Sequence, residues 1–208
     1  MDSKDSLTSQ KELDLVQHII AEPGFWNPFL QINGIPNSAK CFDAIPLPPL
    51  LSAEGDVDVL VVDPSLPEKA SAFQVKRIKV EDSAFDTELP NGIGNIGKLH
   101  QQSELLIDLG FWRVFSVVIV VVDGRMRNTD ESEYVSLTPG LERKIQDSIT
   151  TSGLNSELGL IRMDYVQSFP GPLLNSGVGG VALLRNANVR KQSPKVTDWV
   201  QNTIQNVS

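Results

Sequence analysis

Apolar residues recur at helical spacing near the start of the chain. In Ser9–Ala21 (SQKELDLVQHIIA) they are spaced three and four positions apart, which predicts a helix with one buried face. Ser9 is the predicted N-cap, and Glu12, three residues later, is its predicted capping-box partner. Pro23, followed by glycine, is a typical signal for the end of such a helix.

The pattern changes to that of buried strands further along. Asp58–Val62 (DVLVV) and Ala72–Val80 (AFQVKRIKV) flank a turn-rich segment, DPSLPEKA, and together predict an antiparallel hairpin. Val114–Val122 (VFSVVIVVV) predicts a third, fully buried strand, and it is too short to span a bilayer, which takes about 20 residues. Asn95–Leu109 reads as a helix between the second and third strands, whereas Phe25–Leu51 is rich in proline and predicts an irregular loop.

The last third of the chain continues with elements of both kinds. Thr138–Thr150 predicts a helix, Leu158–Val166 and Gly180–Arg185 predict strands, and Ser193–Gln205 predicts a terminal helix that Ser193 caps and Pro194 opens. The whole order predicts an α/β protein with a mixed β-sheet flanked by helices.

Composition adds limits to this picture. With 208 residues, 40% of them hydrophobic and 21% charged, the chain is expected to form a single domain over 1–208, with a core over about 9–123 and a C-terminal α/β extension over about 138–205. The single cysteine excludes an internal disulfide and a cysteine-based zinc site, and the polar N-terminus lacks a signal-peptide pattern, so a cytoplasmic location is expected.

Charge bears on the class of partner. The formal net charge of −8 argues against a protein that coats polyanions in general, although it permits a local basic groove or a metal-dependent site. The C-terminal quarter is locally basic, and this reads either as a solvated surface or as a contact to a phosphate backbone; its cations are Arg185, Arg190, Lys191 and Lys195.

Two polar residues in the predicted strand Ala72–Val80 call for an explanation. Gln74 and Lys76 are two positions apart and therefore share one face of the strand. One explanation is that this is an edge strand on which charge opposes aggregation. The other is a site, because the hairpin brings Asp58 close to the pair, and carboxylate and amide oxygens are ligands that suit Mg²⁺.

The segments GDVDVLVV and FQVKRIKV resemble the motif of the PD-(D/E)XK nuclease superfamily. That restriction-endonuclease-like core runs helix, three-stranded meander, helix, strand, with an aspartate opening the second strand and (D/E)-x-K on the third. The resemblance implies that Asp58, rather than Asp56, is the first metal ligand, that Gln74 takes the acidic position, and that Lys76 is the motif lysine. The backbone carbonyl of Val75 becomes a further ligand. Glutamine departs from the common motif, and a Q-x-K variant is known in enzymes of the Mrr type.

The resemblance covers about residues 9–123 and implies two further site positions. An acidic residue from the first helix corresponds to Glu12, which also has the capping-box explanation above. A polar residue from the helix after the motif corresponds to Gln101, Gln102 or Glu104.

The implied function is that of a Mg²⁺- or Mn²⁺-dependent nuclease that hydrolyses DNA phosphodiester bonds. The alternative is a catalytically inactive module of the same fold that binds a partner, which the glutamine and the acidic net charge favour. A third hypothesis is a nucleotide site at Gly92, Gly94 and Gly97, but no predicted strand runs directly into the first glycine. Nucleic acid is the expected partner and a membrane is not, while a homo-oligomer or a protein partner stays open.

Overall fold

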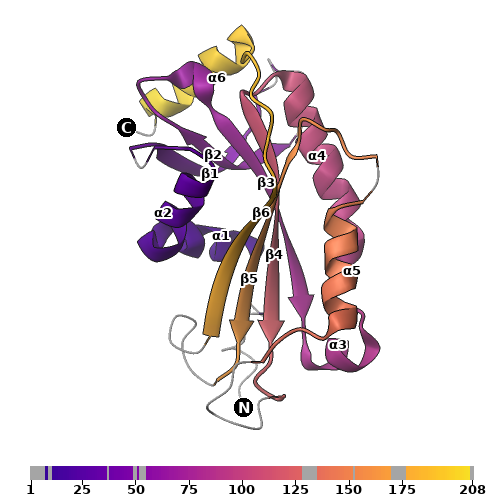
Figure 1. Cartoon of the computed structure of the whole chain (residues 1–208). Helices are drawn as coiled ribbons and strands as arrows, with labels where there is room; N and C mark the ends of the chain where they lie inside the picture. The colour runs from indigo at the N-terminus through magenta and orange to yellow at the C-terminus, as the bar shows by residue number, and fades with distance from the viewer. Residues whose placement is uncertain are drawn as a thin grey trace.

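The computed structural model describes Thr8 and residues 11–36, 38–48, 51, 55–127, 135–151, 153–169 and 177–206. Its strands form one six-stranded sheet in which spatial order follows chain order (Figure 1). The strands are β1 (Lys40–Pro46), β2 (Asp56–Val62), β3 (Ser71–Val80), β4 (Arg113–Asp123), β5 (Gly159–Gln167) and β6 (Gly177–Arg185).

The sheet is mixed, as the sequence predicts. The first three strands form an antiparallel meander, β3, β4 and β5 run parallel, and β6 returns antiparallel to β5. Parallel neighbours need crossover connections, and α4 (Ile96–Leu109) and α5 (Pro139–Ile149) supply them. β4 is buried along its length except at its two ends, which agrees with its continuous apolar run.

Helices cover both faces of the sheet. Figure 1 shows α1 (Glu12–Ala21) and α2 (Pro23–Ile32) on one side, and α4 and α5 on the other. The α1 face of β3 contributes Phe73 and Val75 to the core under α1 and α2. No helix among the described ranges is long and apolar enough to cross a membrane.

The prediction of an irregular loop over Phe25–Leu51 is wrong. Pro23 does not simply end the first helix; it is the first residue of α2, where the missing N–H costs no helical bond. β1 lies in the same segment and pairs with β2 from Lys40 to Pro46. β1 is an edge strand in which Phe42 alone is classed as buried, so it lacks the apolar run by which the sequence reveals β2 and β4.

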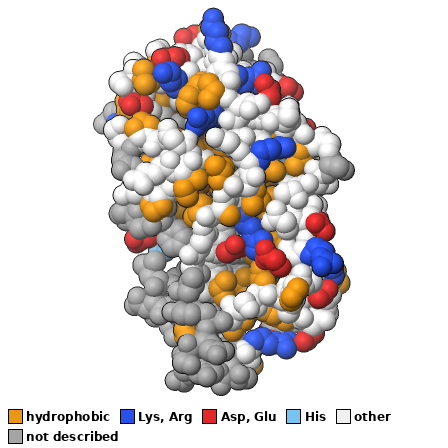
Figure 2. Space-filling view, in the orientation of Figure 1, with side chains coloured by type: hydrophobic (Ala, Val, Ile, Leu, Met, Phe, Trp, Pro, Cys, Tyr) orange, Lys and Arg blue, Asp and Glu red, His pale blue; other side chains and the backbone are white. Residues whose placement is uncertain are grey.

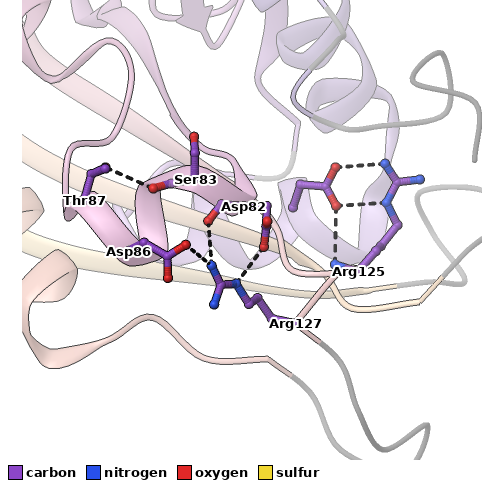
Figure 3. Close-up of polar contacts among 7 residues, drawn as sticks. Asp82, Ser83, Asp86, Thr87, Arg125 and Arg127 are labelled. Atoms are coloured by element: carbon purple, nitrogen blue, oxygen red, sulfur yellow. Dashed lines mark hydrogen bonds and ion pairs between the residues drawn. The ribbon is translucent and has the colours of Figure 1, made fainter.

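A further helix, α3 (Asp82–Thr87), lies in the polar segment between β3 and α4. It has one buried residue, Ala84, so apolar periodicity does not reveal it. Arg127, from the turn after β4, donates to the carboxylates of Asp82 (2.6 Å) and Asp86 and thereby ties the helix to the sheet (Figure 3).

The elements predicted for the last third are confirmed. α5 has Thr138 as its N-cap, with the Thr138 side chain accepting from the Leu141 N–H, and α6 (Pro194–Asn206) opens with Pro194. The Ser193 hydroxyl accepts from the Val196 N–H at 3.3 Å, as expected for an N-cap.

Gln192 joins this C-terminal part to the β2–β3 connection. Its side chain is buried; Oε1 accepts from the Ala70 N–H at 3.0 Å, and Nε2 donates to the Pro67 carbonyl at 2.9 Å. Two backbone groups far away in sequence therefore depend on one amide.

We expect Gln192→Ala to lower the free energy of unfolding by about 2 kcal/mol, because it leaves the buried Ala70 N–H and the half-buried Pro67 carbonyl without this partner. Urea unfolding measures the change. Gln205→Ala, which removes an exposed amide from α6, is the control and should change the free energy of unfolding by less than about 0.5 kcal/mol. Equal effects of the two substitutions would show that the amide of Gln192 has no special structural role.

Candidate functional site

The candidate site lies where β2 and β3 separate. Their pairing covers Val59↔Phe73 to Val61↔Ser71, although β2 stays paired with β1 as far as Asp56 and β3 stays paired with β4 along its whole length. The edge of β3 beyond Phe73 thus loses its strand partner, until Lys79 forms an isolated bridge with Asn91. Two carboxylates take the place of the missing strand.

Asp58 supplies the first carboxylate. Its Oδ2 accepts from the Val75 N–H at 2.7 Å, so a side chain of β2 replaces a ladder hydrogen bond to β3. Burial raises the pKa of Asp58 from 3.8 to about 6; the Val75 N–H opposes the rise, Asp56 and Glu12 add to it, and Lys76 opposes it. The fold therefore keeps a carboxyl group where its charged form is disfavoured.

Glu12, on α1, supplies the second carboxylate. Its Oε2 accepts from the Arg77 N–H at 2.7 Å, and its Oε1 pairs with the Lys76 ammonium at 2.8 Å. Both side chains of the ion pair are 32% exposed, so solvent reaches the pair. Three of the residues singled out in the sequence, Glu12, Asp58 and Lys76, thus meet at the free edge of β3.

The capping-box role predicted for Glu12 is wrong. The N-cap of α1 is Lys11, with no side-chain cap bond, and the predicted N-cap Ser9 lies outside the described residues. A capping box would turn Glu12 back onto its own helix, whereas its carboxylate crosses to β3 instead. This contact joins residues far apart in sequence, so no local pattern reveals it.

The side chain of Gln74, next along β3, is buried, with 2% of its surface exposed. Its Nε2 donates to the Asp56 carbonyl at 2.6 Å, which gives that carbonyl a partner where β2 has separated from β3. A glutamate here would have no N–H to donate, so the glutamine has a structural use at this position. Because the bond to Asp56 uses the Gln74 nitrogen, the Gln74 amide oxygen is the atom that could bind a metal ion.

A buried polar cluster continues from Gln74 across the sheet. Gln74 is the register partner of Ser116 on β4, and the Ser116 hydroxyl lies 3.1 Å from His100 Nδ1 and 2.7 Å from the Ser103 hydroxyl, both on α4. Burial lowers the pKa of His100, which favours the neutral imidazole. This histidine has a packing role between α4 and β4.

The α4 positions that the resemblance implies have other surroundings. Glu104 accepts from the Asn155 N–H at 3.2 Å, in the segment before β5, and the side chains of Gln101 and Gln102 are exposed. The α4 residue that joins the buried polar cluster is instead His100, through the Ser116 hydroxyl on β4.

Metal binding at this site would depend on few protein ligands. No group of three or more His, Cys, Asp or Glu residues in the described part of the chain could hold a metal ion. The predicted donors are instead the carboxylate of Asp58, the amide oxygen of Gln74 and the carbonyl of Val75. Such hard oxygen donors fit Mg²⁺, which uses one or two carboxylates and keeps several waters.

The glycine-rich segment before α4 does not have the geometry of a dinucleotide site. β3 ends at Val80, and α3 lies between it and Gly92, so no strand runs into the first glycine. Gly92 has a φ of +94°, and a Cβ there would lie 2.7 Å from the Arg77 carbonyl oxygen. Position 92 therefore requires a glycine, because a side chain there would collide with the backbone of β3.

Comparison with known proteins finds no matching family model and no matching curated protein.

Proposed function

We propose that this protein is a Mg²⁺-dependent nuclease that hydrolyses DNA phosphodiester bonds. The observation that carries the proposal is the convergence of Glu12, Asp58 and Lys76 at the edge where β2 and β3 part. The order α1, β1–β2–β3, α4, β4 also agrees with the core that the resemblance to PD-(D/E)XK nucleases implies. DNA cleavage that requires Mg²⁺, and is lost when Asp58 or Lys76 is replaced by alanine, tests the proposal.

Each side chain has a role that follows from its position. Asp58, Gln74 and Val75 would hold the ion, which when bound lowers the pKa of water and offsets charge on the phosphate. The Val75 N–H fixes one oxygen of Asp58, so the carboxylate is held in one orientation before any ligand arrives. Lys76, oriented by Glu12, places a positive charge where negative charge develops on the phosphate oxygens.

A catalytically inactive binding module is the second candidate function. The bond from Gln74 to the Asp56 carbonyl favours it, because this bond stabilises the fold without any metal. In addition, Figure 2 shows Lys and Arg interspersed with Asp and Glu over the face in view, with no continuous basic stripe among the described side chains there.

Metal binding separates the two candidates. If the chain is a nuclease, Mg²⁺ at about ten times its dissociation constant should stabilise the folded protein by about 1.4 kcal/mol. Asp58→Ala should abolish this stabilisation, because it removes the one carboxylate among the predicted ligands. Thermal unfolding with and without Mg²⁺, together with calorimetric titration, measures both quantities.

Asp63→Ala is the matched control, since Asp63 is an exposed carboxylate just beyond the other end of β2. It should leave Mg²⁺ binding as in the wild type. Wild-type protein without any Asp58-dependent Mg²⁺ or Mn²⁺ binding would favour the inactive module.

A further inference from the structure

Three cations lie close together on β3, beside the candidate site. Lys76, Arg77 and Lys79 fall within four consecutive positions, and β3 (SAFQVKRIKV) contains no acidic residue. The whole chain carries a formal net charge of −8, so β3 is opposite in sign to the chain, with the carboxylates of Glu12 and Asp58 beside it. The three side chains are partly exposed.

The cations extend from both faces of the strand at its free edge. Arg77 and Lys79 share the strand face of Phe73 and Val75, which is the α1 face, whereas Lys76 belongs to the opposite face. Because β2 has separated from β3 here, no strand in the described part of the chain pairs with this edge between Phe73 and the Lys79–Asn91 bridge. A ligand that approaches the edge therefore meets positive charge on both sides.

Lys11 adds a fourth cation on the α1 side. It is the exposed N-cap residue of α1, next to Glu12, and the Glu12 carboxylate in turn contacts the Arg77 backbone. Glu12 also forms the ion pair with Lys76, so one carboxylate contacts both the Lys76 ammonium and the Arg77 backbone. Burial lowers the pKa of Arg77, although Glu12 opposes this, so the fold places the guanidinium where hydration is incomplete.

We propose that Arg77 and Lys79, with Lys11, bind successive phosphates of a DNA backbone on the α1 side of the candidate site. This inference rests on the proposed function for its choice of ligand. Residues two apart on a strand are about 7 Å apart, so Arg77 and Lys79 contact separate phosphates, while Lys76, which Glu12 orients, faces the phosphate at the candidate site. Because phosphate contacts carry no base information, the binding is independent of DNA sequence.

DNA binding without divalent metal tests this inference separately from catalysis. Fluorescence anisotropy of two labelled duplexes of unrelated sequence, in EDTA and across about 50–200 mM salt, gives the dependence of log K on log salt. The double substitution Arg77→Gln/Lys79→Gln should reduce the slope by about 2, since each phosphate contact contributes roughly 0.9. At the lowest salt the affinity should fall at least about tenfold, equally for both duplexes.

Arg143→Gln/Lys144→Gln removes the same charge from exposed positions of α5, away from the β2–β3 separation, and is the matched control. It should leave the slope within about 0.5 of the wild-type value. An unchanged slope in Arg77→Gln/Lys79→Gln, equal losses in the two double variants, or no DNA binding by the wild type would each overturn the inference.

The two proposals fail in different ways. If the wild type cleaves DNA and Arg77→Gln/Lys79→Gln binds DNA as tightly as the wild type does, this inference is wrong and the nuclease function stands. If that variant loses binding but the wild type shows no metal-dependent cleavage, the binding surface stands and the nuclease function is wrong.

Discussion

Replacement of Lys76 or Asp58 with alanine is expected to lower Mg²⁺-dependent DNA cleavage by about 100-fold or more, the usual cost of losing one electrostatic group from an active site. The two residues meet at the same edge of β3: Asp58 accepts from the Val75 N–H, and Lys76 pairs with Glu12. Neither substitution removes a large buried side chain, so both variants should stay folded. The measurement is the initial rate of cleavage of supercoiled DNA, with an EDTA blank for each protein.

Lys144→Ala is the control for the loss of a lysine. Like Lys76, Lys144 forms an ion pair with a glutamate, here Glu88, but it belongs to α5 and an exposed position away from the β2–β3 separation. We expect its cleavage rate to equal that of the wild type. If the wild type, Asp58→Ala and Lys76→Ala all cleave at the same low rate, the activity belongs to a contaminant and the catalytic proposal is wrong.

The parts of the site that lie on one hairpin could be predicted from sequence. Asp58 opens an apolar run, and Lys76 follows on the next one, so strand periodicity and a short turn bring them together. Glu12 was named through the family resemblance, yet its capping-box geometry was wrong, because the bond that fixes it comes from β3. The structural role of Gln74 cannot be predicted from sequence. It depends on the separation of β2 from β3, which leaves the Asp56 carbonyl to accept a hydrogen bond from the Gln74 amide.

Contacts between residues far apart in sequence also explain which helices and strands the sequence does not reveal. The sequence reveals β4 because all its central residues are buried, and it reveals α4 through a buried face and Gly110 at its end. β1 is half exposed on an edge, and α3 is held by charged residues, with Arg127 donating to Asp82 and Asp86. Elements that owe their stability to tertiary contacts carry little local signal.

The carboxylate of Asp58 should cost the protein stability at neutral pH. Its pKa in the folded state is about 6, above the ordinary 3.8, so the folded protein holds this proton more tightly than the unfolded chain does. The favourable contribution of the protonated group is complete below about pH 4, is lost as pH rises towards 6, and is absent above about pH 7. Asp58→Asn removes the charge but keeps an oxygen that can accept from the Val75 N–H.

We therefore expect Asp58→Asn to be more stable than the wild type by about 2–3 kcal/mol at pH 8 in EDTA, and nearly equal to it at pH 4. Urea unfolding across this pH range measures the difference. Asp63→Asn is the control with the opposite sign, because hydrogen bonds from Ser65 lower the pKa of Asp63; its substitution should bring no gain at pH 8. A neutral amide could accept the same hydrogen bond at this edge without destabilising the fold. A destabilising carboxylate is therefore expected here if a bound ligand requires its negative charge. If Asp58→Asn is instead less stable at pH 8 than the wild type, Asp58 is a structural substitute for the missing strand, and the case for a metal site loses its main support.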